Sequence, residues 1–343
     1  MRQQTQFLWE TYFSSVDKIV MTTLEIVKDR ISRHLSRASL QWNHTPGGLV
    51  SLPQYSENLQ DFPFYLNAFN LHPSSAFTAV IYATSPIVTA SSAIYKLMKN
   101  VVSSQHVDKV VVIWVSDKSP PLKNKWPSTS VPIIVIKPQN KTINSRFYPH
   151  VAIQTDAVLG LDEDVLLTTS EVNFAFSVWK SFPERIVGYA ARNHYWDDYN
   201  NRWGYTSKMT NDYSMVLTGA AFYHRYYPYL FTHHLTPELH SFVGNLSNCE
   251  DILMNFLVSH VTKLPPIKLS QRRQYREAPA ADGRATWSEL RRFAERQTCF
   301  NTFADAFGGV PLARSGTRFD PVLFRDPVAN FRKKYRQMEL VNS

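Results

Sequence analysis

The sequence predicts an α/β protein with a mostly parallel central sheet flanked by helices. Short apolar runs alternate with helix-like stretches from residue 77 onwards, the pattern of strands joined by crossover helices. The run at 157–161 carries no charge, as expected of a strand buried on both faces of a parallel sheet. It is followed by Asp162, Glu163 and Asp164, at the edge where open α/β sheets bind their ligands.

The individual elements follow in order along the chain. Apolar residues with helical spacing over residues 1–40 predict an amphipathic helix that needs a partner surface, and residues 53–73 have the composition of a connector. Strands are expected at 77–83, 110–115, 131–136, 157–161 and 186–189, and helices at 87–102, at 171–179 with Thr169 or Ser170 as the cap, and around 252–258.

Composition limits the class of protein. The chain has 343 residues, of which 44% are hydrophobic and 13% aromatic, so it is long enough for about two globular domains and is not disordered. Its net charge of +9 favours polyanionic partners, which include nucleic acids, anionic glycans and nucleotide diphosphates. No RNA- or DNA-binding motif accompanies this charge, so nucleic acid is not an expected partner.

Cysteines and glycosylation sequons bear on the compartment. Cys249 and Cys299 would be free thiols in a cytosolic protein. In a secretory lumen they could form a disulfide around a loop of about 50 residues, worth ~3–4 kcal/mol. Asn140 and Asn245 begin sequons, and a third, at Asn43, is weakened by a following proline. Since the sequence shows neither a signal peptide nor a membrane span, we expect a chain that lacks its true N-terminus.

The acidic motif has two interpretations. Asp162 and Asp164 are one residue apart, and two such carboxylates can bind a hard divalent cation that also carries a diphosphate. The same pattern arises by chance in solvated turns. No glycine-rich phosphate loop follows the first strand, so a nucleotide site here would depend on a metal.

The second half of the chain holds further candidates. Glu250 and Asp251 are either ordinary residues of a helix N-terminus or carboxylates that face a reacting sugar. Arg296 would lie beside Asp251 if the two cysteines are bonded, where it could stabilise a departing diphosphate. The arginine-rich stretch 272–292, which includes Trp287, is either a solvated loop or a surface for an anionic glycan.

Longer stretches of the chain are similar to the C-terminal part of the exostosins, the family that polymerises the heparan sulfate backbone. They are residues 126–127 with 131–132, 156–164, 174–176, 182–189, 202–208, 212–220, 248–256 and 296–299, and they extend into 7–10 and 320–324. The resemblance therefore covers nearly the whole chain.

This resemblance implies a type A glycosyltransferase fold with a Rossmann-like sheet. The implied reaction is retaining, Mn2+-dependent transfer of α-linked N-acetylglucosamine from UDP-GlcNAc to the glucuronate end of a growing heparan sulfate chain. Asp162, Glu163 and Asp164 would form the donor motif, with Asp164 and Asp162 as metal ligands. Asp251 would lie beneath the anomeric carbon.

The resemblance also assigns roles to the basic residues and implies a cellular setting. Arg296 would contact the donor diphosphate, Arg146 would reach the donor from the loop before the strand at 157–161, and Glu250 would adjoin the donor. Trp287 and Arg192 are candidates for the acceptor. Residues 1–70 would be the connector from a missing N-terminal domain, and 71–343 the transferase domain. We expect the lumen of the Golgi and endoplasmic reticulum, a membrane anchor outside this chain, and a homo- or hetero-oligomer with another exostosin.

Three positions depart from the family pattern. Pro86, Val115 and Ser116 stand where smaller family members carry an arginine and asparagines near the nucleotide. Loss of such contacts would weaken donor binding by ~1–3 kcal/mol each. The alternative function is therefore a weakly active or inactive domain that supports a heteromeric heparan sulfate polymerase.

Overall fold

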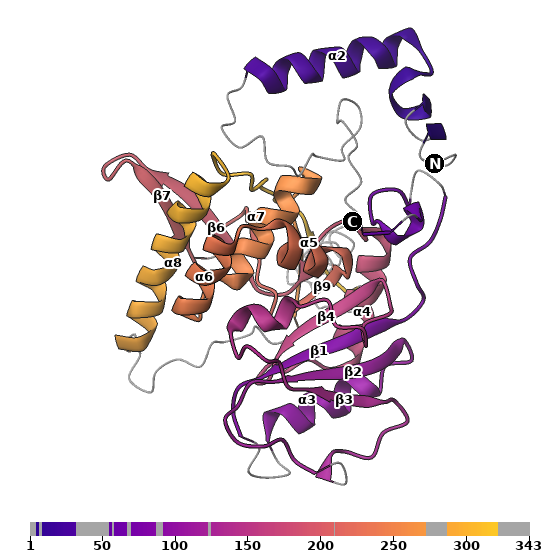
Figure 1. Cartoon of the computed structure of the whole chain (residues 1–343), viewed down its shortest axis with the longest axis vertical. Coiled ribbons are helices and arrows are strands. Elements are labelled where there is room, and N and C mark those ends of the chain that lie inside the picture. Colours follow the sequence, from indigo (N-terminus) through magenta and orange to yellow (C-terminus); the bar gives the residue numbers. More distant parts are fainter. Residues whose placement is uncertain are drawn as a thin grey trace, which may run out of the picture.

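The structure is a computed structural model that describes residues 5–6, 9–31, 55–56, 58–66, 70–86, 92–122, 125–208, 210–271 and 287–321. Within these residues, an eight-stranded sheet has the order β11-β10-β5-β9-β4-β1-β2-β3, and a three-stranded sheet has the order β7-β6-β8. The small sheet lies with α6, α7 and α8 on one side of the molecule, away from β1, β2 and β3 (Figure 1).

The strands are β1 (Phe77–Ala83), β2 (Val107–Trp114), β3 (Ile133–Ile136), β4 (Ala157–Asp162), β5 (Val187–Gly188), β6 (Ala191–Asp197), β7 (Arg202–Thr206), β8 (Met215–Val216), β9 (Ala220–His224), β10 (Ile267–Leu269) and β11 (Arg318–Phe319). The α-helices are α2 (Val16–Ile31), α3 (Ala93–Val102), α4 (Thr169–Ser181), α5 (Tyr226–His234), α6 (Pro237–Leu246), α7 (Glu250–Thr262) and α8 (Trp287–Ala306). Shorter helices are η1 (Trp9–Phe13), η2 (Leu59–Asp61) and η4 (Ile143–Phe147).

The expected α/β class and its parallel strands are confirmed. β1 pairs in parallel with both β2 and β4, and β2 pairs in parallel with β3. The sequence prediction missed the strands β6 to β11. One of them, β9, runs antiparallel between β4 and β5. The five residues of β9 do not alternate between apolar and polar side chains as a predicted strand would. Their conformation is decided by pairing with strands on both sides.

Successive side chains of the main sheet point alternately into two separate hydrophobic cores, as a strand period of two requires. Phe77, Ile81 and Leu159 pack with α3 and α4 on one face. Val80, Tyr82 and other residues of the opposite parity pack with α5, α7 and α8 on the other face. The strand predicted at 157–161 is buried at all five positions, so its lack of charge has the expected cause.

The start of α4 corrects a sequence prediction. The cap is Thr168, not Thr169 or Ser170, which are the first helical residues. The Thr168 hydroxyl accepts a hydrogen bond from the Glu171 backbone N–H, and the Glu171 carboxylate accepts one from the Thr168 N–H. This reciprocal capping box satisfies two helix-terminal donors and so fixes the boundary one residue earlier.

The N-terminal segment forms the π-helix η1 and the helix α2, which lies apart from the sheets (Figure 1). Tyr12 of η1 is buried, whereas Val16, Val20 and Leu24 of α2 are exposed. The amphipathic helix predicted from the apolar spacing is therefore present over 16–31, and much of its apolar face is uncovered by the residues that the structure describes. None of the described helices combines the length and the apolar character needed to cross a membrane.

We predict that Phe222→Ala, in the centre of β9, strongly destabilises the fold. Phe222 is fully buried, and its ring lies 5.0 Å from the Phe77 ring and 5.6 Å from the Phe176 ring. Removal of a buried phenyl group costs ~3–5 kcal/mol, which urea unfolding would measure. Tyr199→Ala, at an exposed position, should change the unfolding free energy by no more than ~0.5 kcal/mol. Equal small effects from both substitutions would contradict the packing described for β9.

Candidate functional site

The acidic motif directs its first two carboxylates to different neighbours. Asp162 ends β4, and its side chain forms an ion pair with Arg146. The Glu163 carboxylate instead accepts hydrogen bonds from the Thr84 N–H (3.1 Å), the Thr84 hydroxyl (2.7 Å) and the Ser85 N–H (3.1 Å). Glu163 therefore holds the loop that follows β1, while Asp162 faces the helical half of the molecule.

A glycine makes room for the Asp162 carboxylate. The Asp162 N–H donates to the Gly219 carbonyl at 2.8 Å. A Cβ atom at position 219 would lie 1.9 Å from Asp162 Oδ2, closer than any non-bonded contact allows. The absence of a side chain at Gly219 is therefore required for this carboxylate position.

Arg146 is the buried centre of the site. It lies in η4, and its guanidinium binds Asp162 through one nitrogen and Glu250 Oε1 through the other, at 2.6 Å. The side chains of Arg146 and Glu250 are only 7% and 6% exposed, so both charges depend on this pairing. The guanidinium also lies 5.2 Å from the Tyr82 ring centroid and 5.7 Å from that of Phe147.

The electrostatics of these groups are coupled. Burial alone would lower the pKa of Arg146, but the negative charges of Asp162 and Glu250 raise it above its ordinary value. Burial and the adjacent Asp251 raise the pKa of Glu250, while Arg146 and Arg296 act in the opposite direction. The two arginines therefore offset the repulsion between the neighbouring buried carboxylates of Glu250 and Asp251.

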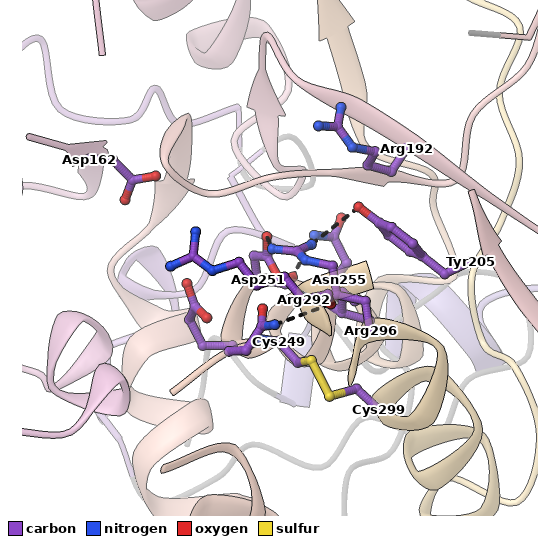
Figure 2. Close-up of polar contacts among 12 residues, drawn as sticks. Asp162, Arg192, Tyr205, Cys249, Asp251, Asn255, Arg292, Arg296 and Cys299 are labelled. Carbon is purple, nitrogen blue, oxygen red and sulfur yellow. Dashed lines mark hydrogen bonds and ion pairs between the residues drawn. A yellow bond between two sulfur atoms is a disulfide. The ribbon is translucent and has the colours of Figure 1, made fainter. Parts of the chain in front are cut away.

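A second arginine–carboxylate pair lies beside the first. Arg296 of α8 donates to Asp251 Oδ2 at 3.0 Å and to the Tyr205 hydroxyl at 3.2 Å, and its guanidinium lies 5.5 Å from the Tyr205 ring centroid. Figure 2 shows Arg296 between Asp251 and Tyr205, with Asp162 on the far side of Asp251. Negative and positive side chains therefore alternate across the site, from Asp162 to Arg146, then to the carboxylates at the start of α7, and then to Arg296.

A disulfide connects the two helices that carry this pair. Cys249 and Cys299 are bonded, with Cys249 directly before α7 and Cys299 three residues after Arg296. The bond ties the residue that precedes α7 to α8 (Figure 2). Arg296 is thereby kept within reach of Asp251.

The remaining carboxylate of the motif, Asp164, is exposed at the edge of the site. Partial burial and the charges of Asp162 and Glu163 raise its pKa, so a cation there would relieve repulsion. In the described residues no group of three or more His, Cys, Asp or Glu side chains could hold a metal by itself. Of the two carboxylates expected to bind a cation, Asp162 is paired with Arg146 and Asp164 is exposed.

The structure places the other predicted site residues as follows. Arg192, in β6, lies near Tyr205 (Figure 2). Its positive charge opposes the rise in the pKa of the Tyr205 hydroxyl that burial causes. Trp287 begins α8, but its side chain is outside the described set. Asn140 and Asn245 are both exposed, as glycosylation requires. Asn43 lies outside the described residues, as does most of the arginine-rich stretch.

Sequence reasoning missed several residues that build the site. Tyr205 contacts Arg296, Gly219 accommodates Asp162, and Asn255 holds α7 against β8. All three residues lie within stretches that carry the family resemblance, which was the one available signal. No residue pattern distinguished them, because their roles arise from contacts across distant parts of the chain.

Together, the sheet and the charged residues at the carboxyl end of β4 define an α/β protein of the glycosyltransferase type. The chain belongs to glycosyl transferase family 64: the model of the glycosyl transferase family 64 domain matches residues 77–324. It is 59% identical to Exostosin-1a of Danio rerio and to Exostosin-1 of Bos taurus, and 58% identical to Exostosin-1 of Mus musculus. These matches cover 99% of the chain but only 46–47% of the relatives, so the chain spans about half their length.

We predict that Arg146→Ala destabilises the protein in a pH-dependent manner. Loss of the arginine leaves Glu250 buried without its partner, which costs ~3–5 kcal/mol near neutral pH. Because the pKa of Glu250 is already raised, the folded protein binds this proton more tightly than the unfolded chain, and stability falls as the pH rises. Arg146 opposes that shift, so the variant should lose more stability at about pH 7.5 than at about pH 5.

Urea unfolding at both pH values measures this difference. Arg318→Ala is the matched control, since Arg318 forms a solvent-exposed ion pair with Asp320, and its loss should cost less than ~1 kcal/mol. A loss in Arg146→Ala that is independent of pH, or no larger than in the control, would contradict the coupling of Arg146 to Glu250.

Proposed function

We propose that this chain is the transferase domain of a heparan sulfate-synthesising enzyme. It moves α-linked N-acetylglucosamine from UDP-GlcNAc to the glucuronate end of the chain with retention of configuration. The observation that carries the proposal is the pair of contacts Arg146–Glu250 and Arg296–Asp251. They place two guanidinium groups at the first turn of one helix, close to the Asp162 carboxylate, where a diphosphate would find both positive charge and metal ligands.

Each residue has a distinct part in the proposed reaction. Arg296 and Arg146 stabilise the negative charge that develops on the leaving diphosphate. Asp251, held by Arg296 at 3.0 Å, stabilises the positive charge at the anomeric carbon or acts as a transient nucleophile. The acceptor hydroxyl attacks from the face that the diphosphate leaves, and the diphosphate takes its proton. Mn2+ bound by Asp164 and Asp162 would supply Lewis-acid stabilisation of the leaving group.

The donor and acceptor sides receive further residues under this proposal. Glu250 supports the donor site through Arg146, and Glu163 acts on it indirectly by holding the loop after β1. Arg192 and Trp287 are assigned to the acceptor, where a cation and an aromatic ring suit a uronate-containing glycan. We extend the proposal to a lumenal setting in the Golgi and endoplasmic reticulum and to assembly with another exostosin chain.

A second function is a weakly active domain that supports a partner polymerase. It is favoured by the carboxyl ends of β1 and β2, where Pro86, Val115 and Ser116 supply no cationic or amide side chain to a nucleotide base. Ser116 is buried, and its carbonyl accepts a hydrogen bond from Lys141 at 3.4 Å. This candidate and the first make different predictions for the same assay.

We predict Mn2+-dependent transfer from UDP-GlcNAc to a glucuronate-terminated oligosaccharide. Asp164→Ala and Asp251→Ala should each lower the rate at least ~100-fold, because each removes a charge that acts in the transition state. Asp198→Ala, an exposed carboxylate in the turn after β6, is the matched control and should retain the rate of the unmodified protein. Product linkage, determined by NMR, tests the retention of configuration.

Donor binding can be measured separately from turnover. UDP with Mn2+ should raise the melting temperature, and a ligand at 100 times its dissociation constant stabilises by ~2.7 kcal/mol. Binding without turnover would favour the partner-domain function. A folded protein that shows neither turnover nor a thermal shift would overturn the proposed donor site.

A further inference from the structure

Two helix side chains pair with the outer edge of β7 as though α8 were another strand. Gln297 accepts a hydrogen bond from the Tyr205 N–H at 2.9 Å and donates one to the Tyr205 carbonyl at 2.5 Å. Asn301 does the same with Trp203, at 3.0 and 2.9 Å. The other edge of β7 is paired with β6, so these amides satisfy backbone groups that would otherwise have no strand partner.

The spacings of helix and strand match closely at this contact. Positions four apart on a helix are separated by ~6 Å along the axis, and positions two apart on a strand by ~6.6 Å. Gln297 and Asn301 can therefore both reach β7 in a single register. A shift of α8 by one residue would carry both amides off the edge and break all four hydrogen bonds.

The opposite edge of the small sheet holds α7 in the same manner. Asn255 accepts from the Val216 N–H at 3.0 Å and donates to the Val216 carbonyl at 2.8 Å. Val216 belongs to β8, which pairs with β6 on its other side. The order β7-β6-β8 thus gives the small sheet a side-chain amide contact at each outer edge, from α8 at β7 and from α7 at β8.

These contacts lie directly beside the charged pair of the site. Asp251 is one helical turn before Asn255, and its carbonyl accepts a 2.8 Å hydrogen bond from the Asn255 amide. Arg296 precedes Gln297 and reaches the hydroxyl of Tyr205, the residue whose backbone Gln297 holds. Tyr205 is only 2% exposed, so it has little freedom to move away from this position.

The disulfide alone does not set this geometry. Cys299 is two residues from both Gln297 and Asn301, which is about 200° around an α-helix. The disulfide therefore holds α8 from the side that faces α7, and the amides hold it from the side that faces β7. On the side of α7, Phe300 and Phe303 also pack against Phe256, and the two amide contacts fix α8 on the opposite side.

We propose that Asn255, Gln297 and Asn301 are positioning residues that set α7 and α8 against the small sheet and thereby hold Arg296 in contact with Asp251. The catalytic consequence rests on the proposed function, in which this pair acts on the leaving diphosphate and the anomeric carbon. The position of the Arg296 guanidinium is a separate claim, which can be tested without an activity assay.

The first experiment measures the chemical reactivity of Arg296 in the folded protein. Phenylglyoxal modification, resolved by residue with mass spectrometry, should proceed several-fold faster at Arg296 in Gln297→Ala, because the guanidinium loses its fixed contacts. Thr298→Ala is the matched control: among the described residues its hydroxyl bonds only to the Ala294 carbonyl within α8, and Arg296 should react at the rate of the unmodified protein. An unchanged rate in Gln297→Ala would overturn the proposal.

A milder variant keeps the experiment decisive if Gln297→Ala does not fold. Gln297→Glu preserves the acceptor for the Tyr205 N–H but cannot donate to its carbonyl, and circular dichroism would verify its fold. Arg296 should become more reactive in this variant also. A folded Gln297→Glu protein with the reactivity of the parent would count against the proposal as strongly as an unaffected Gln297→Ala.

The second experiment is a double-mutant cycle on transfer from UDP-GlcNAc. Gln297→Ala should lower kcat by roughly ten- to a hundredfold with little change in the donor KM, as expected for a misplaced catalytic group. In the Arg296→Ala background the same substitution should have no further effect, because Gln297 acts through Arg296. Additive losses would show a general structural effect and contradict the proposal.

The outcomes separate this inference from the proposed function. If the parent protein catalyses no transfer, the proposed function fails, and the reactivity of Arg296 still decides whether the amides position it. If transfer occurs but the reactivity of Arg296 and the cycle show no coupling, the function stands and the positioning role is wrong.

Discussion

The burial of Arg146 between Asp162 and Glu250 is the constraint on which the rest of the site depends. Asp162 ends a strand of the main sheet, and Glu250 begins α7, so this guanidinium joins the two halves of the molecule. A buried charge of either sign would be costly alone. The sheet, η4 and α7 must therefore meet in one arrangement, and that arrangement brings the acidic motif to the start of α7.

The small sheet gives the same region its second set of contacts. Its outer strands are bonded to side-chain amides of α7 and α8, and the disulfide joins those helices directly. Asp251 and Arg296 thus stand on elements that are fixed at several points, as a preorganised electrostatic site requires. The conformational cost of bringing the charges together is met during folding, before any ligand arrives.

The uncharged run at 157–161 predicted a buried strand with acidic residues at its carboxyl end, and the structure confirms both. The sequence could not show that Glu163 would hold the Thr84–Ser85 loop while Asp162 would face Arg146. Which neighbour each carboxylate meets depends on the strand beside β4 and on the helices over it, and both come from distant parts of the chain.

By itself, the sequence determined the α/β class, the buried strands and the residues that carry the charges, because hydrophobic periodicity and residue type are local properties. The family resemblance added the expectation that these charged residues bind a metal ion and a UDP-sugar. Only the tertiary structure decided that β9 would run antiparallel within the sheet, that Arg146 would bridge Asp162 and Glu250, and that amides on α7 and α8 would pair with strand edges. These features arise where segments far apart in sequence must satisfy one another's buried polar groups, and no local pattern encodes which partner will be there.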